Sequence, residues 1–311
     1  MEKLTNVQML IGAVLIIAVI ITSGLVYIAF SPNPNTITMY TTTSTDNSGL
    51  LDYLKPMWEK ATGISVDWVA VGTGNAIQAG ENGEADVLMV HARTLEDEFV
   101  SAGYGMHRVS LMHNDFVLVG PSSDPAGVNG MTNATAVFEK LYQDRNTIQF
   151  VTRGDNSGTN VRELELWNSS NVYVNVSDTT WLNNNQWYID AGSGMSKTLT
   201  VASTKQAYTL TDRATFLKVN STIDLTILAQ DPTSSLWANP YGVILVDPAK
   251  FPNINIKVDL AKKFVSWLIS DAGQAAINAY RINGKQVFFA DFQNYKSQMS
   301  TSELNYWNQT I

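Results

Sequence analysis

The sequence predicts an α/β fold made of two lobes, and three observations lead to that prediction. Short apolar segments typical of strands alternate with amphipathic segments typical of helices over residues 36–311. This stretch of roughly 275 residues is large for one hydrophobic core and sufficient for two. Breaker residues at 121–125 (PSSDP) and at 239–241 (NPY) mark where the chain crosses between the lobes and returns.

The predicted elements follow the chain in order. In the first lobe we expect strands at residues 37–40, 64–71, 85–90 and 116–120, and helices at 48–60, 75–80 and 95–102. In the second we expect helices at 134–143, 159–167 and 193–204, a strand at 148–152, and loop with a short helix over 168–187. A strand at 242–246 and helices at 260–269 and 272–280 follow the return. Pro56 is expected to kink or divide its helix, and the alternation of strands and helices predicts a parallel sheet.

This order divides the chain into three parts. Residues 1–35 precede the lobes, residues 36–120 together with 239–311 form lobe 1, and residues 121–238 form lobe 2. Two strand-like crossings join the lobes, with a hinge expected near residues 119–121 and 238–241. We expect the ligand site in the cleft between the lobes.

Residues 9–30 predict one N-terminal transmembrane helix. They are 22 residues without a charge, enough to cross a hydrocarbon layer of about 30 Å. The apolar part of a cleaved signal peptide is usually only about 7–15 residues long, so we expect an uncleaved anchor, with a cleaved and secreted form as the alternative. Lys3 precedes this segment and the next basic residue is Lys55, which favours a binding domain outside the cell membrane.

The composition excludes several classes of protein. The chain has 20 Lys and Arg against 28 Asp and Glu, a net charge of −8, and no basic cluster, so nucleic acid is not an expected partner. It has no cysteine and only 3 histidines, and no sequence motif for a metal, a phosphate-binding loop or a nucleophile elbow. We therefore expect no catalytic residues, no resident metal and no cofactor. A hydrolase that uses a serine with one of the distant histidines remains a remote alternative.

Residues 41–45 (TTTST) are the most informative segment. Five successive hydroxyl residues lie between a predicted strand and a predicted helix. The first turn of a helix has unpaired N–H groups and a partial positive charge, so hydroxyls there can help to bind an anion. An ordinary helix cap explains one or two of these residues but not five.

Three other turns have the same character. Residues 152–160 (TRGDNSGTN) follow an apolar strand and supply a cation, hydroxyls and glycines; residues 192–196 (GSGMS) and 72–74 (GTG) are shorter versions. Each turn is weak evidence by itself, but there are four of them, two in each lobe. Because α/β sheets bind ligands beyond the carboxyl ends of their strands, the four turns predict a small anion enclosed between the lobes, with Arg153 balancing its charge.

Several segments resemble tungstate-binding proteins of the TupA type, which are the substrate-binding components of ABC importers. They are residues 41–56, 71–76 (VGTGNA), 80–92 (GENGEADVLMVHA), 152–159, 192–195 and 207–216 (AYTLTDRATF). The similarity covers most of residues 37–290 in consistent order. It implies a type II periplasmic-binding-protein fold, and a monomer that captures tungstate, with molybdate as competitor. It also implies delivery to an integral-membrane permease with its cytosolic ATPase.

The resemblance also implies which residues bind the oxyanion. The positions that match are Thr43, Ser44, Thr73, Arg153, Ser157, Thr159, Ser193 and the backbone of Met195. This sequence departs from the family at Asn47, where Asp is common, and at the N-terminus, where a lipid-anchored or cleaved form is common. Within residues 207–216, Tyr208 and the 212–213 pair are expected to pack and form pairs beneath lobe 2.

Phosphate or sulfate is the alternative ligand, because phosphate-binding relatives have a similar R-x-D-x-S-G-T segment. Phosphate keeps one proton at neutral pH and needs an acceptor, whereas tungstate and molybdate need only donors. Asp46 and Asp155 are the two carboxylates near the motifs. We expect Asp155 to cap its helix or to orient Arg153 rather than to accept a proton from the ligand.

Overall fold

The computed structural model describes residues 34–175 and 178–308, and the chain from Ile37 onward forms one compact unit. The anchor predicted at residues 9–30 lies outside the described residues. Within the described part of the chain, no helix is both long and apolar enough to span a bilayer.

The main sheet has the strand order β12-β4-β9-β3-β1-β2, and β7 and β8 also pair with β4. The strands are β1 (Thr36–Thr42), β2 (Ser65–Val71), β3 (Val87–Val90), β4 (Gly105–Gly120), β7 (Thr209–Asp212), β8 (Thr226–Ala229), β9 (Ala238–Val246) and β12 (Phe289–Ala290). Strands β1 and β3 are parallel, whereas β9 runs antiparallel to both β3 and β4. The expected parallel sheet is therefore wrong: the returning strand β9 inserts between β3 and β4 and makes the sheet mixed.

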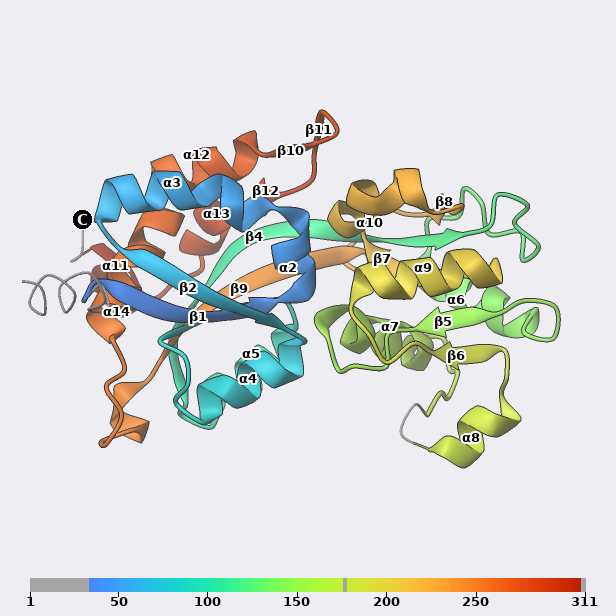
Figure 1. The fold of residues 1–311 in the computed structure, drawn as a ribbon, viewed down its shortest axis with the longest axis horizontal. Coiled ribbons are helices and arrows are strands. Elements are labelled where there is room, and N and C mark those ends of the chain that lie inside the picture. Colours follow the sequence, from blue (N-terminus) through green and yellow to red (C-terminus); the bar gives the residue numbers. More distant parts are fainter. Residues whose placement is uncertain (1–33, 176–177, 309–311) are drawn as a thin grey trace, which may run out of the picture. The chain divides into compact units, whose positions relative to one another are not determined.

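Strands β4 and β9 are the two crossings, and they run side by side between the two groups of elements (Figure 1). The first part of β4 pairs with β9 as far as Asp115, opposite Ala238, and the last part pairs with β7 from Phe116 onward. Strand β4 changes partner at Asp115 and Phe116, several residues before the hinge expected near 119–121. The second expected hinge segment, 238–241, coincides with the start of β9.

The helices of lobe 1 cover both faces of its sheet (Figure 1). They are α2 (Thr43–Ser48), α3 (Leu50–Thr62), α4 (Thr73–Glu81), α5 (Arg93–Ser101), α11 (Val258–Ile269), α12 (Asp271–Ala279), α13 (Phe292–Lys296) and α14 (Thr301–Asn308). Helix α3 continues through Pro56, so the expected division there is wrong. The break lies instead at Gly49, whose φ of 78° is easily adopted only by glycine.

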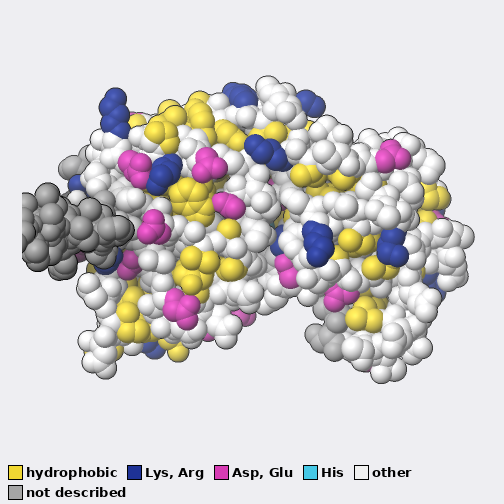
Figure 2. All heavy atoms as spheres, in the orientation of Figure 1, with side chains coloured by type: hydrophobic (Ala, Val, Ile, Leu, Met, Phe, Trp, Pro, Cys, Tyr) yellow, Lys and Arg dark blue, Asp and Glu magenta, His cyan; other side chains and the backbone are white. Residues whose placement is uncertain are grey.

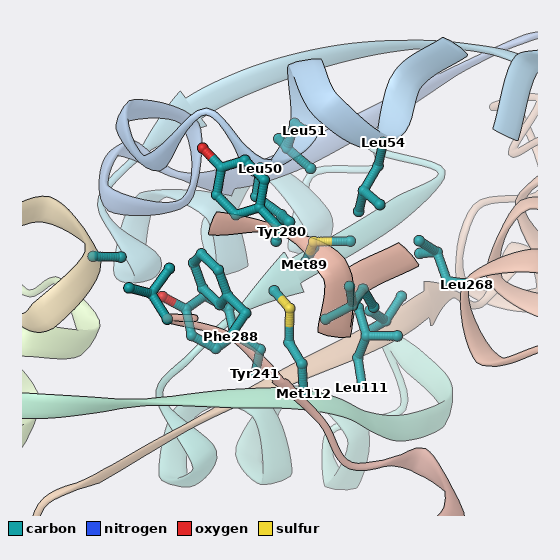
Figure 3. Packing of buried hydrophobic residues seen from close by; sticks show 14 of the residues in the cluster. Leu50, Leu51, Leu54, Met89, Leu111, Met112, Tyr241, Leu268, Tyr280 and Phe288 are labelled. Atoms are coloured by element: carbon teal, nitrogen blue, oxygen red, sulfur yellow. The ribbon is translucent and has the colours of Figure 1, made fainter. Parts of the chain in front are cut away.

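The larger hydrophobic core joins α3 to the sheet. Figure 3 shows Leu50 and Leu54 of α3 close to Met89 of β3, with Met112 of β4 and Tyr241 of β9 in the same cluster. All five are at most 1 % exposed. This packing fixes the start of α2 and α3 relative to both crossing strands, and the site lies at that junction.

Lobe 2 has its own core around Phe138, Phe150 and Trp167, whose rings meet edge to face or tilted at 4.5–5.9 Å. Its further elements are α6 (Ala134–Gln143), β5 (Phe150–Thr152), α7 (Gly158–Ser169), α8 (Thr179–Asn184), β6 (Tyr188–Asp190), α9 (Met195–Lys205) and α10 (Arg213–Val219). Strands β5 and β6 are parallel, so the loops that follow them lie at the same edge. Those loops are residues 153–157 and 191–194, two of the four predicted turns.

Candidate functional site

The segment between β5 and α7, in lobe 2, contacts the turns of lobe 1 that contain Thr43 and Thr73. The Arg153 Nη2 group donates to the Thr43 hydroxyl at 3.4 Å, and the Gly158 N–H donates to the Thr73 hydroxyl at 3.1 Å. A third contact between the lobes runs from the Gly74 N–H to the Asn156 carbonyl at 3.1 Å. The structure therefore brings the turns at 41–45, 72–74 and 152–160 together.

The turn before α9 joins the same group. The Ser193 N–H donates to the Arg153 carbonyl at 3.2 Å, and a Cβ atom added to Gly194 would lie 3.6 Å from the Thr43 hydroxyl oxygen. Met195 is the first residue of α9 and its side chain is fully buried. The N–H groups in the first turn of such a helix have no acceptor within the helix.

The residues implied by the resemblance are almost all enclosed. Exposure is at most 2 % for Ser44, Thr73, Arg153, Ser157, Thr159 and Met195. Thr43 and Ser193 are half-buried. Ser157 is the N-cap of α7, and its hydroxyl accepts the Asn160 N–H at 3.2 Å. The site is thus a closed polar interior between the lobes.

Arg153 supplies the positive charge in this interior. Its Nη2 group pairs with Asp155 Oδ2 at 2.6 Å, and Asp155 Oδ1 accepts the Ser157 N–H at 3.2 Å. Asp155 thus orients Arg153, as one of the two expectations had it, whereas the N-cap of α7 is Ser157 and not Asp155. Asp46, the other carboxylate near the motifs, accepts from Trp68 Nε1 at 2.8 Å.

Unpartnered donors mark the ligand-facing side of the site. Eight described side chains have a buried polar atom without a hydrogen-bond partner. Three of them are implied site residues: Arg153 through Nε, and Thr159 and Ser193 through their hydroxyls. Buried polar groups are normally paired because desolvation without a partner is costly, so three donors on contacting loops indicate a ligand that accepts hydrogen bonds.

The structure corrects the interpretation of the five-hydroxyl run. The Thr41 hydroxyl donates to the Met89 carbonyl at 2.8 Å, and the Thr42 and Thr45 hydroxyls bond each other at 2.6 Å. Ser44 Oγ lies 3.0 Å from His91 Nε2. Only Thr43 directs its hydroxyl toward lobe 2. Most of the run therefore fixes the turn itself, and Ser44 can reach an anion through its backbone N–H rather than its hydroxyl.

Asp212 is a neighbouring group that the sequence did not place in the site. It is fully buried at the start of α10, where Oδ1 accepts the Thr215 N–H at 2.9 Å while Oδ2 has no partner. Burial raises its pKa, and the Thr215 N–H and the charge of Arg153 act against that rise. By contrast, Tyr208 and Arg213 pair with Asp124 and Asp115, as expected for packing residues.

Glu163 of α7 is a buried carboxyl that contacts Thr152, the residue before Arg153. Glu163 accepts hydrogen bonds from Tyr188, Thr152 and Trp167 at 2.5–3.0 Å. Burial raises the pKa of Glu163 from its usual 4.5 to about 7, although these bonds oppose the shift. The carboxyl therefore stays largely protonated in the folded protein at pH values where it is ionised in the unfolded chain.

Replacement of Glu163 by Gln should flatten the pH dependence of stability. Below pH 4.5 the Glu163 carboxyl is neutral in both the folded and the unfolded chain, so its burial costs no ionisation. As the pH rises from 4.5 to about 7, only the unfolded chain ionises, and the free energy of unfolding should fall by on the order of 3 kcal/mol. Chemical denaturation between pH 5 and 8 should show this decline in the parent protein but not in Glu163→Gln. The exposed Glu165→Gln on the same helix should keep the parental curve. A decline of equal size in Glu163→Gln would contradict the assignment.

One histidine lies at the site and two lie away from it. His107 and His113 pair with Glu303 and Asp291 in the C-terminal segment. His91 contacts Ser44, and its Nδ1 lies 2.9 Å from Asn239 Oδ1. This order of serine, histidine and amide is also the geometry of a hydrolase nucleophile and its base. Burial, and then the charge of Arg153, lower the pKa of His91 to about 4, which makes it a weak base.

Two α/β lobes joined by a pair of crossing strands, with unpartnered donors enclosed between them, define a solute-binding protein. The sequence matches the family described as the PBP superfamily domain over residues 31–272. Proteins of this class bind a solute for a transporter and are not enzymes.

Three individual proteins show the similarity in more detail. A protein of Haloferax volcanii, named as a candidate anion-binding protein of an ABC transporter, is 44 % identical over 81 % of this chain and 71 % of its own length. The tungstate-binding protein TupA of Peptoclostridium acidaminophilum is 41 % identical over 82 % of this chain and 83 % of its own. The solved structure of TupA from Desulfovibrio alaskensis is 43 % identical over 82 % of this chain and 98 % of its own, with a TM-score of 0.67. The chain belongs to the TupA-type family within the PBP superfamily.

Proposed function

We propose that this protein binds tungstate, and also molybdate, outside the cytoplasm and delivers it to an ABC permease with its cytosolic ATPase. The observation that carries the proposal is the set of buried donors without partners: Arg153 Nε, Thr159 Oγ1 and Ser193 Oγ. Arg153 and Ser193 lie on loops, and Thr159 lies in the first turn of α7; Arg153 contacts Thr43, and Gly158, next to Thr159, contacts Thr73. The names of the relatives favour tungstate among the oxyanions that such donors could bind.

The chemistry of the donors suits a fully deprotonated oxyanion. Each oxygen of such an anion accepts hydrogen bonds and donates none, so it needs hydroxyls, N–H groups and a guanidinium around it. Arg153 supplies charge, Thr159 and Ser193 supply hydroxyls, and the first turns of α7 and α9 add N–H groups with a favourable dipole. Charged side chains of both signs are interspersed on the face shown in Figure 2.

Titration calorimetry of the purified protein with tungstate, molybdate, sulfate and phosphate tests the proposal. We expect tight, saturable binding of tungstate and molybdate and weaker binding of sulfate and phosphate. An absence of heat with tungstate and molybdate alike would refute the proposal.

Thr159→Val should weaken tungstate binding about 5- to 30-fold. The substitution keeps the shape of the side chain but removes one buried hydroxyl donor, which is worth about 1–2 kcal/mol. Thr200→Val, at an exposed position on α9, should bind like the parent protein. Equal affinities for the parent and Thr159→Val would show that this hydroxyl does not contact the anion.

Phosphate remains the second candidate because of Asp212, whose buried Oδ2 has no partner and could accept the proton of hydrogen phosphate. Asp212→Asn distinguishes the two ligands. It should leave tungstate binding intact, because a fully deprotonated oxyanion has no proton for Asp212 to accept. It should weaken phosphate binding if Asp212 accepts the phosphate proton. Selective loss of phosphate binding, together with phosphate as the tightest ligand of the parent, would favour this candidate.

A hydrolase is the remaining alternative, and the Ser44–His91–Asn239 geometry is the observation in its favour. It predicts hydrolysis of p-nitrophenyl acetate above the buffer rate that disappears in Ser44→Ala. The low pKa of His91 argues against it, because the base would be weak near neutral pH. A rate equal to that of buffer would remove this alternative.

The lobe division at residues 36–120 with 239–311, and 121–238, implies that the lobes open and close about β4 and β9. We propose that a monomer works in this way, held at the outer face of the cell membrane by residues 9–30. The direct contacts between the lobes at Thr43 and Thr73 correspond to the closed form. Small-angle scattering should show compaction when tungstate is added, and unchanged dimensions would count against closure.

A further inference from the structure

Five buried side chains form a hydrogen-bonded chain from the lobe 1 side of the site into both crossing strands. Ser44 Oγ lies 3.0 Å from His91 Nε2, and His91 Nδ1 lies 2.9 Å from Asn239 Oδ1. Asn239 Nδ2 donates to Asn114 Oδ1 at 2.6 Å, and Asn114 Nδ2 donates to the Tyr241 hydroxyl at 3.4 Å. None of the five is more than 3 % exposed.

The amides determine where the protons lie. Asn239 uses its Nδ2 group on Asn114, so its Oδ1 faces His91 as an acceptor. His91 must then have its proton on Nδ1, and its Nε2 accepts the Ser44 hydroxyl proton. A neutral ring is needed for this arrangement, and burial followed by the charge of Arg153 lowers the pKa of His91 to about 4.

His91 also lies between the lobes. Its ring packs on Tyr241 with centroids 4.8 Å apart. On its other side lies lobe 2, where a Cβ atom added to Gly158 would be 2.4 Å from His91 Nδ1. Ser44 is bonded to this ring, and its neighbour Thr43 receives the hydrogen bond from Arg153. A displacement of Ser44 would therefore move Thr43 away from Arg153.

We infer that His91 is a positioning residue of the oxyanion site, which holds Ser44 so that the Thr43 hydroxyl faces Arg153 while the Ser44 hydroxyl is turned away from the ligand. The inference rests on the proposed function for its effect on binding, but the position of the His91 proton does not depend on it. Asn239 and Asn114 fix the tautomer from the two crossing strands, so the hinge and the anion site share one chain of hydrogen bonds.

Nitrogen NMR of the histidine-labelled full-length protein, without ligand, tests the inferred position of the His91 proton. His91 should show a protonated Nδ1 and an unprotonated Nε2, which is the less common tautomer. Its signal is assigned by its loss in His91→Ala, or by its change in Asn239→Leu if the first variant does not fold. Protonation at Nε2 would overturn the inference even if tungstate binds as proposed.

A double-substitution cycle with tungstate as the probe tests the second part. Ser44→Ala and His91→Ala should each weaken binding about 10-fold. The double variant should also lose about 10-fold, because both substitutions remove the same contact between Ser44 and His91. An additive loss of about 100-fold would overturn the inference, since Ser44 would then contact the anion by itself. His113→Ala, which removes a histidine paired with Asp291 elsewhere, should bind normally. If the parent protein binds no tungstate, the proposed function fails and the NMR result still decides the tautomer.

Chemical rescue separates positioning from filling of space. A cavity of about 50 Å³ is lined in part by His91 and Asn239, and it adjoins the position that a small ring would take in His91→Ala. Imidazole should restore tungstate affinity to within about threefold of the parent. The molecule 1-methylimidazole fills similar space but cannot donate to Asn239, so it should restore little. Equal rescue by both would show that His91 acts only through packing.

Discussion

Replacement of Arg153 by Ala is expected to weaken tungstate binding about 30- to 800-fold. The guanidinium is 2 % exposed, and its Nε group has no partner in the protein. Loss of the cation leaves a buried dianion without its opposite charge, a cost of about 2–4 kcal/mol. Titration calorimetry measures the change directly. Arg153→Lys should fall between the parent and Ala, because an ammonium keeps the charge but cannot bond Asp155, Thr43 and the anion with one planar group.

The matched control is Arg145→Ala. This arginine also belongs to lobe 2, but its guanidinium lies over the Tyr142 ring at 4.2 Å, away from the four turns. Its loss should leave tungstate affinity within about twofold, a difference of roughly 0.4 kcal/mol. If Arg145→Ala and Arg153→Ala weakened binding equally, the effect would come from the overall charge and not from the site.

Gly158→Ala is expected to weaken tungstate binding about 100-fold without unfolding the protein. The new Cβ atom would lie 2.5 Å from the backbone carbonyl oxygen of His91 in the opposite lobe. Backbone cannot rotate away, so the lobes must stay apart and the donors on either side no longer surround the anion. The loss corresponds to about 3 kcal/mol, at the upper end of the cost of overpacking.

Gly74→Ala provides the comparison for Gly158→Ala. Its Cβ atom would lie 2.3 Å from the Nδ2 group of Asn156, also across the lobes, but a side-chain amide can rotate aside. Binding should fall by less than about tenfold. Scattering should show compaction on addition of tungstate in Gly74→Ala but not in Gly158→Ala. Normal compaction in both would mean that His91 and Gly158 do not limit closure.

The elements with a clear local pattern were predictable from the sequence. Helix α6 has the predicted bounds because Asn133 caps it and its apolar residues recur on one face. Strand β4 is 16 residues long, and its first part was missed because Arg108 interrupts the apolar pattern. Arg108 is tolerated there through a buried pair with Glu96 at 2.7 Å, a partner that no local pattern indicates.

The residues of the site likewise fall into those that a local pattern indicates and those that it does not. The turns around Thr73, Arg153 and Ser193 were predictable, because glycine and hydroxyl residues recur in four turns between a strand and a helix. His91, Asn239 and Asp212 are single polar residues at the ends of apolar strands. Their role depends on which strands become neighbours, and β9 returns from more than a hundred residues away to bring Asn239 to His91. The spacing of residues along the chain does not indicate which distant residues come into contact.

Strand β4 belongs to the sheets of both lobes, pairing with β9 up to Asp115 and with β7 from Phe116 onward. Neither half can lose its order without breaking a strand that the other half needs. The two halves should therefore melt together in one cooperative transition, although each has a core of its own. Binding of a ligand would then protect the entire body against denaturation, including parts that never touch it.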